Sequence, residues 1–275
     1  MIFALGIFIG LVMGLTGAGG SILVVPLLMA ATGWGLQQVA PTALLAVASA
    51  AGLGAYLAWR KSQVRYRAAT LMAFIGAFTA PLGLAAAGMV SSAVLSLLFV
   101  AILGLVSVRL WRQVMNPVPV TVTQVLSQRD LAEGQQRLCR LNDSSGRLIW
   151  TSPCALCISI TGAVTGFLSG LLGVGGGFFI VPALHSATEL SMHSAVGTSL
   201  MAIALTSFGA LLGAVWQGHT LTWALAWPLM GGALLGISLG RQLAPKLAGA
   251  RLQLAFASLV SLVALGMAVR ATGLV

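Results

Sequence analysis

The chain has 275 residues, of which 59% are hydrophobic and 7% are charged, and its formal net charge is +10. A soluble domain carries about 25% charged residues, so this composition excludes an ordinary soluble protein and indicates a membrane protein. The positive charge does not indicate a nucleic-acid-binding protein, because the basic residues stand at the ends of apolar runs, where the positive-inside rule expects them.

The first part of the chain, residues 1–112, is predicted to form a broken apolar segment followed by three membrane-spanning helices. Residues 2–14 and 21–32 flank a glycine cluster, and each piece would be about 20 Å long as a helix. Neither piece alone crosses a hydrocarbon core of about 30 Å. They therefore form either one broken helix that crosses or a re-entrant hairpin that enters and returns. The three full spans are expected at 39–59, 68–88 and 92–111.

The second part, residues 151–275, has the same organisation. Residues 113–150 are the extended polar stretch between the two parts, and we expect them to form a cytoplasmic linker rather than a domain. The second broken segment comprises 153–172 and 177–188, and its spans are expected at 195–216, 222–243 and 251–270.

Two glycine-rich stretches repeat each other at a constant offset. Residues 10–26 read GLVMGLTGAGGSILVVP, and residues 166–182 read GFLSGLLGVGGGFFIVP. Matched glycine-interrupted segments in two halves of a membrane protein are typical of a transport site. The matched pairs include Gly10/Gly166, Gly14/Gly170, Gly17/Gly173, Gly19/Gly175, Gly20/Gly176 and Pro26/Pro182.

The distribution of lysine and arginine separates the two topologies. The basic residues cluster within 60–67, 109–150 and 241–251. If both glycine-broken segments are re-entrant hairpins, all three clusters lie on the cytoplasmic side, as the positive-inside rule requires. Three crossings in each half make the halves inverted and should bring the two glycine turns together near the mid-plane. We therefore predict an all-α integral membrane protein of two inverted repeats, each a glycine-broken re-entrant hairpin plus three transmembrane helices.

The glycine turns are candidate anion sites. A helix that begins inside the membrane presents unpaired N–H groups and the positive end of its dipole, and glycine lets a ligand approach the backbone. No Asp or Glu lies within a predicted span and no Lys or Arg lies at mid-span, so binding should depend on dipoles and hydroxyls. The alternative is that the glycines serve only tight turns and close packing. The candidate substrate-binding residues are Thr16, Gly17, Gly19, Gly20, Ser21, Thr42, Gly173, Gly175, Gly176, Gly177, Thr198 and Ser199.

No catalytic residue, metal site or other cofactor is expected. The spans lack the clustered acids, histidines or nucleophile that an integral-membrane enzyme needs. His185 and His193 flank Glu189 at a spacing that suits a metal poorly; they are either interfacial residues or a proton relay. Cys154 and Cys157 form a C-x-x-C without a second pair, and we interpret them as small apolar packing residues.

The motifs GLxGAGGSxLxVP in the first half and GxLxGLLGVGGGFxxVPAL in the second, the latter followed by AVGTSL, resemble the TauE/SafE sulfite exporter family. The resemblance covers nearly the whole chain. It implies transport of small sulfur oxyanions or organosulfonates across the bacterial inner membrane. Ser21 stands where the second half has Gly177, so the two turns are not expected to be equivalent. The resemblance places the signature glycines at Gly17, Gly19, Gly20, Gly173, Gly175, Gly176 and Gly177.

The function expected from these features is secondary transport of sulfite or an organosulfonate by alternating access. The alternatives are an anion channel that uses the same turns, a permease for a different small anion, an integral-membrane enzyme and a structural subunit. The expected partners are the small anion and the lipid bilayer, and no nucleic acid. Proton coupling and a homo-oligomer are both compatible with the sequence.

Overall fold

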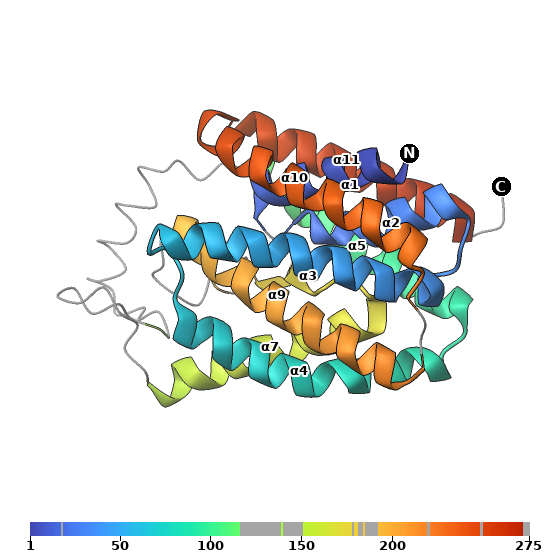
Figure 1. Ribbon diagram of the computed structural model, residues 1–275, viewed down its shortest axis with the longest axis horizontal. Coiled ribbons are helices and arrows are strands. Elements are labelled where there is room, and N and C mark those ends of the chain that lie inside the picture. The colour runs from blue at the N-terminus through green and yellow to red at the C-terminus, as the bar shows by residue number, and fades with distance from the viewer. Residues whose placement is uncertain are drawn as a thin grey trace.

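The computed structural model describes residues 1–17, 19–115, 139, 151–177, 179–180, 184, 192–218, 221–247 and 250–271. Its elements are α-helices that lie roughly along the long axis of the molecule (Figure 1). They are α1 (Ile2–Thr16), α2 (Ser21–Thr32), α3 (Leu36–Arg60), α4 (Tyr66–Met89), α5 (Ser92–Met115), α7 (Ser152–Leu172), α9 (Met192–Trp216), α10 (Trp223–Leu247) and α11 (Ala250–Ala271).

These helices confirm the all-α membrane architecture. Within the described residues, α3, α4, α5, α7, α9 and α10 are long and apolar enough to cross a membrane. They include α7, which the sequence predicts as part of a hairpin, whereas the predicted span 251–270 appears as a shorter apolar helix, Leu254–Val269. The first apolar segment breaks at the glycine cluster as predicted, and α1 and α2 are each too short to cross alone. Large apolar side chains such as Phe74, Phe78, Leu262 and Leu265 face outward, as lipid-facing residues do. Most of the predicted linker and of 178–191, with His185 and Glu189, lies outside the described residues.

Glycines bring two helix pairs into backbone contact, and each pair joins the two halves of the chain. A Cβ atom added at Gly10 of α1 would collide with the Ala233 carbonyl of α10, and one at Gly166 of α7 would collide with the Gly76 carbonyl of α4. Small residues allow this close approach of helices in a membrane. Gly232, Gly236 and Gly240 of α10 are packing residues of the same kind, since a Cβ atom added at each would collide with the backbone of α1.

The contacts also fix the direction of the helices. The central helices α3 and α9 lie side by side (Figure 1) and run in opposite directions, because Gly54 meets Leu200 whereas Ala58 meets the earlier Gly197. The helix α1 runs parallel to α10, and α7 runs parallel to α4. Each end of the bundle therefore collects the start of one central helix and the end of the other.

Basic residues gather at one end of this bundle, which we call the basic end. The helix α3 ends at Arg60 and Lys61, and α4 begins next to Arg65 and Arg67. Arg241, near the end of α10, donates a hydrogen bond to the Gly54 carbonyl of α3. We call the opposite end, where α3 begins and α4 ends, the pocket end.

The interpretation of the cysteines needs a correction. Cys154, at the start of α7, is bonded to Cys139 in a disulfide, with the two Cα atoms 5.0 Å apart. Such a distance suits a disulfide. Only Cys157 is a free thiol in the part of the chain that the structure describes. The C-x-x-C spacing gave no signal for this pair, because the partner of Cys154 lies on its N-terminal side, at Cys139.

Candidate functional site

The second glycine turn, residues 173–177, follows α7 and lies against the central helices. Gly173 caps α7 in the left-handed conformation, with φ +68°, and donates to the Ser169 carbonyl at 2.9 Å. A Cβ atom added at Gly173 would lie 2.5 Å from the Ala40 Cβ of α3. Gly175 also has a positive φ, and its Cβ would lie 2.5 Å from Ser207 Oγ of α9. The chain can therefore pass between α3, α7 and α9 only because these residues have no side chain.

Buried hydroxyl groups surround this turn. The side chains of Thr165 and Ser169 on α7 and of Ser207 on α9 are fully buried. Thr165 donates to the Thr161 carbonyl at 2.8 Å, within its own helix. The hydroxyls of Ser169 and Ser207 have no hydrogen-bond partner. Because a buried unpaired hydroxyl costs about 1–3 kcal/mol, these two groups are unusual in a folded protein and are free to donate to a ligand.

The first glycine turn, residues 17–20, joins α1 to α2. Gly17 has φ +82°, and its Cβ would lie 2.6 Å from Val196 Cγ1 of α9. A Cβ atom at Gly19 would lie 2.7 Å from the Phe256 ring of α11, and one at Gly20 would lie 2.5 Å from the Met13 nitrogen. The contact of Gly20 with Met13 shows that the chain folds back after α1. The following helix begins at the fully buried Ser21, and no side chain caps its first turn.

The two glycine turns lie at different depths along the central helices. Gly17 meets Val196, beside the Gly197 that contacts Ala58 at the basic end. Gly173 meets Ala40 near the start of α3. Gly173 lies about 27 Å along α3 from the level of Ala58, but Gly175 contacts Val47 and Ile203, near the middle of α3 and α9, and Ile203 is 7 residues, or about 10 Å, from Val196. The first turn therefore packs near the start of α9, and the second extends from the start of α3 to its middle. The meeting of the two turns near the mid-plane stays a prediction.

The predicted hydroxyl residues fall into two groups. Thr42 is buried on α3, two residues beyond the Ala40 that meets the second turn. Thr198 and Ser199 lie on α9 next to the Val196 that meets the first turn. Thr198 accepts the backbone N–H of Arg65 at 3.0 Å and so holds the loop between α3 and α4.

Two of these hydroxyl protons are already used within their own helices. Ser199 donates to the Val196 carbonyl at 2.8 Å, and Thr16 donates to the Val12 carbonyl at 2.7 Å. The predicted turn residues thus group as Thr16, Gly17, Gly19, Gly20 and Ser21 at the first turn, and Gly173, Gly175, Gly176 and Gly177 at the second.

Sequence reasoning did not identify Ser169 and Ser207. The available signal was the spacing of Thr161, Thr165 and Ser169 at every fourth residue, which puts their hydroxyls on one face of a helix. The structure buries that face beside the second turn.

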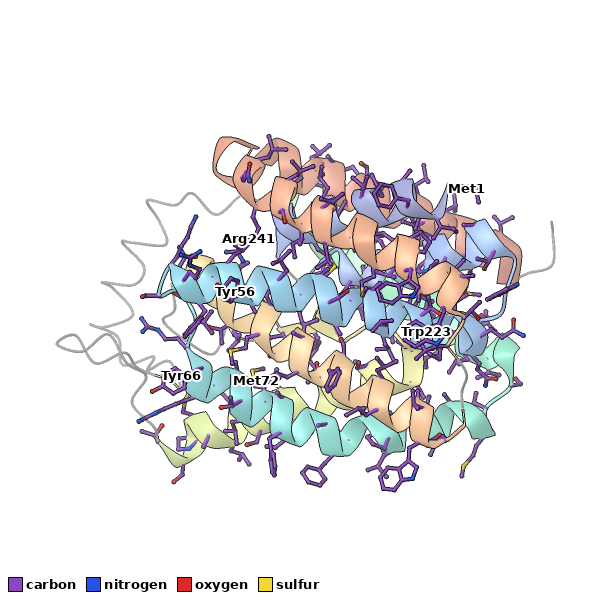
Figure 2. All side chains as sticks on the ribbon, viewed as in Figure 1. Met1, Tyr56, Tyr66, Met72, Trp223 and Arg241 are labelled. Atoms are coloured by element: carbon purple, nitrogen blue, oxygen red, sulfur yellow. A yellow bond between two sulfur atoms is a disulfide. The ribbon has the colours of Figure 1, made fainter. Side chains whose placement is uncertain are left out.

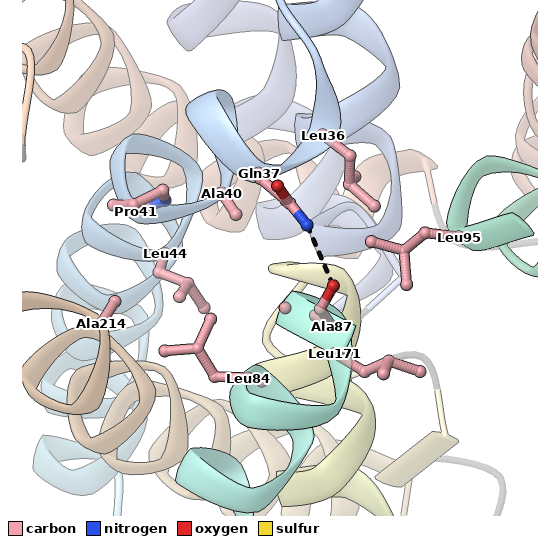
Figure 3. Close-up of a pocket in the computed structure, with 12 residues that line it drawn as sticks. Leu36, Gln37, Ala40, Pro41, Leu44, Leu84, Ala87, Leu95, Leu171 and Ala214 are labelled. Atoms are coloured by element: carbon pink, nitrogen blue, oxygen red, sulfur yellow. Dashed lines mark hydrogen bonds between the residues drawn. The ribbon is translucent and has the colours of Figure 1, made fainter. Parts of the chain in front are cut away.

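A pocket at the pocket end adjoins the second turn (Figure 3). It lies where α3 begins, α4 ends and α7 ends, and its side chains are apolar except for Gln37. The Gln37 amide donates to the Ala87 carbonyl at 2.9 Å. Ala40 lines this pocket and also contacts Gly173, so one alanine separates the pocket from the turn.

The electrostatic character of both turns favours an anion. All four acidic residues of the chain, Asp130, Glu133, Asp143 and Glu189, lie outside the described residues, which therefore contain no side-chain carboxylate. The described residues also contain no cluster of His, Cys, Asp or Glu that could hold a metal ion. At the second turn, the donors named above are backbone N–H groups and neutral hydroxyls, and such groups suit a small anion.

Comparison with known proteins places the chain in a family of membrane transporters. The family described as "Sulfite exporter TauE/SafE" matches residues 2–267. A "Probable membrane transporter protein" of Xylella fastidiosa strain Temecula1 is 33% identical over 250 residues, which cover 90% of this chain and 85% of that protein. The "Probable membrane transporter protein YunE" of Bacillus subtilis is 28% identical, over 87% of this chain and 86% of YunE. No solved structure matches the chain.

Proposed function

The chain belongs to the TauE/SafE sulfite exporter family, and on that premise we propose that it is a secondary transporter for sulfite or a small organosulfonate. The family and the names of its relatives indicate a multi-pass membrane transporter rather than an enzyme. The substrate and the mechanism are the parts that we propose.

The observation that carries the proposal is the pair of buried, unpartnered hydroxyls at the second glycine turn. Ser169 and Ser207 reach this turn from two different helices. A sulfite or sulfonate group offers several oxygen acceptors to such donors, and the absence of side-chain carboxylates from the described residues avoids repulsion of its charge. Binding by neutral donors is weak enough for the anion to leave again.

We propose that the two halves are inverted repeats that alternate access between the two sides. In support, the equivalent helices α3 and α9 run in opposite directions, and the first helix of each half packs against the other half. We propose two half-sites rather than one shared cradle, because Gly17 and Gly175 contact α9 at Val196 and Ile203, about 10 Å apart along the helix. The anion would bind at the second turn from the pocket end and at the first turn from the basic end, as the halves rock.

The proposed orientation places the basic end in the cytoplasm and the pocket end outside the inner membrane. This follows from the positive-inside rule applied to Arg60, Lys61, Arg65 and Arg67. In this orientation α1 and α2 form a re-entrant hairpin that enters from the outside, turns at Gly17 and returns before α3 begins.

Uptake of labelled sulfite into proteoliposomes tests the function. We expect saturable uptake that competes with one of thiosulfate, taurine or sulfoacetate but not with chloride. We also expect accelerated exchange when unlabelled sulfite is present on the opposite side, which a carrier shows and a simple channel does not. Folded protein that takes up none of these anions would refute the substrate assignment. Saturation without exchange would favour an anion channel.

A further inference from the structure

We propose that Arg241 binds the transported anion at the first glycine turn and makes the basic end the side of higher affinity. This inference rests on the proposed function, because it assigns a residue to one of its two half-sites.

Arg241 lies beside the end of α1, which leads into the first turn. A Cβ atom added at Gly14, three residues before Gly17, would lie 2.9 Å from the Arg241 backbone nitrogen. The Arg241 side chain is half-buried and reaches across to the Gly54 carbonyl of α3. Figure 2 shows Arg241 on α10 at the end of the bundle that also holds Tyr66. The Arg241 backbone thus lies about one helical turn from the first glycine turn, and its guanidinium reaches α3 at the same end of the bundle.

Arg241 is a charge in the last turn of an apolar span. The span of α10 runs from Trp223 to Ala244 and includes it. The described residues provide no carboxylate for it, and the Gly54 carbonyl uses only one of its five N–H donors. An ionised residue within a membrane helix is costly to place and is a functional candidate for that reason. An anion at the first turn would supply the missing countercharge.

The repeat provides an internal comparison for this position. A Cβ atom added at Gly14 would lie 2.9 Å from the Arg241 backbone nitrogen. One added at its counterpart Gly170 would lie 2.9 Å from the Leu84 backbone nitrogen. Leu84 is therefore the equivalent of Arg241, and it lines the pocket next to the second turn. One half-site has a cation where the other has an apolar side chain. The two ends of the transport path should therefore bind the anion with unequal affinity, more tightly at the basic end.

Two other roles for Arg241 have to be separated from anion binding. Arg241 could act only as a cap for the Gly54 carbonyl, or only as one of the basic residues that orient the protein in the membrane. Arg241→Gln keeps an N–H donor for the carbonyl but removes the charge, whereas Arg241→Lys keeps the charge. Arg67→Gln is the matched control, because Arg67 is an exposed cation at the same end.

The test measures the KM for sulfite from each side, in proteoliposomes of defined orientation. We expect Arg241→Gln to raise the KM at the basic end about 10-fold or more, with little change at the pocket end, because a charge-assisted hydrogen bond is lost. Arg241→Lys should recover most of the affinity, and Arg67→Gln should match the wild type. An Arg241→Gln variant with wild-type KM on both sides would overturn the inference, and so would an equal effect of Arg67→Gln.

A second variant decides the matter if Arg241→Gln does not fold. Leu84→Arg places the same charge at the equivalent position beside the pocket and should lower the KM at the pocket end. An unchanged KM there would overturn the inference. Transport by the wild type together with either negative result would leave the proposed function standing. Absence of sulfite transport by the wild type would instead reject the proposed substrate.

Discussion

Ser169 and Ser207 are the residues on which the proposed anion site at the second turn depends. Both hydroxyls are fully buried and unpaired, so removing either one should leave the fold as stable as before or slightly more stable. Their removal should weaken binding of an anion that accepts from them. We expect Ser169→Ala and Ser207→Ala each to raise the KM for sulfite at the pocket end about 5- to 10-fold, which corresponds to one neutral hydrogen bond of about 1 kcal/mol.

The control for Ser207 is its neighbour Thr206. The Thr206 hydroxyl is equally buried but donates to the Ala202 carbonyl of its own helix at 2.9 Å. The isosteric Thr206→Val should therefore leave the KM unchanged. If the serine variants instead lower the melting temperature without changing the KM, these hydroxyls are part of the packing and the second turn is not the binding site.

The sequence repeat could not reveal these serines. At the constant offset of the repeat, Ser169 corresponds to Met13 and Ser207 to Ala51, so neither position stands out when the halves are compared. The glycines could be predicted because the backbone needs them in both halves. The hydroxyls serve only one half, and their burial beside the turn depends on how α7 packs against α9.

At the scale of helices, the sequence predicted the bounds of the elements well but not where the turns pack. Apolar runs closed by basic residues or glycines defined α3 to within a few residues, since both features act locally. The depth of each glycine turn depends on contacts such as Gly17 with Val196 and Gly173 with Ala40, which join distant parts of the chain. No local pattern reports those contacts, so the sequence alone could not place the depth of the two turns.

The packing of α7 on α4 should be far more sensitive to a methyl group than the free surface of α5. A Cβ atom added at Gly170 would collide with the Ala80 carbonyl, whereas one at Gly104 of α5 would meet no atom within 4 Å. We expect Gly170→Ala to destabilise the protein by about 1–3 kcal/mol through overpacking. Gly104→Ala should be neutral or should stabilise by about 0.5–1 kcal/mol, because alanine favours the helix.

Thermal unfolding in detergent measures this difference between the two glycines. Both variants add one methyl group to a membrane helix, so a general effect of hydrophobicity cancels in the comparison. Equal melting temperatures for Gly170→Ala and Gly104→Ala would contradict the close α4–α7 contact on which the pairing of the two halves depends.

At the scale of the whole molecule, inversion of the halves can be tested at equivalent positions. Lys61 follows the end of α3 and Gln217 follows the end of α9, and the two correspond at the offset of the repeat. Both side chains are exposed. Because α3 and α9 run in opposite directions, we expect Lys61→Cys to react with an impermeant maleimide from the cytoplasm and Gln217→Cys to react from the outside.

This labelling needs a background in which Cys139, Cys154 and Cys157 are replaced by serine, so that only the introduced thiol reacts. Sulfite uptake by that background must first match the wild type, which also shows whether the Cys139–Cys154 disulfide matters for transport. Labelling of both introduced cysteines from one side would reject the inverted repeat and with it alternating access by rocking of two opposed halves. Labelling of Lys61→Cys from the outside and Gln217→Cys from the cytoplasm would keep the repeat but reverse the orientation. Arg241 would then hold the anion at the external face, so the same experiment decides which face of the membrane has the higher affinity.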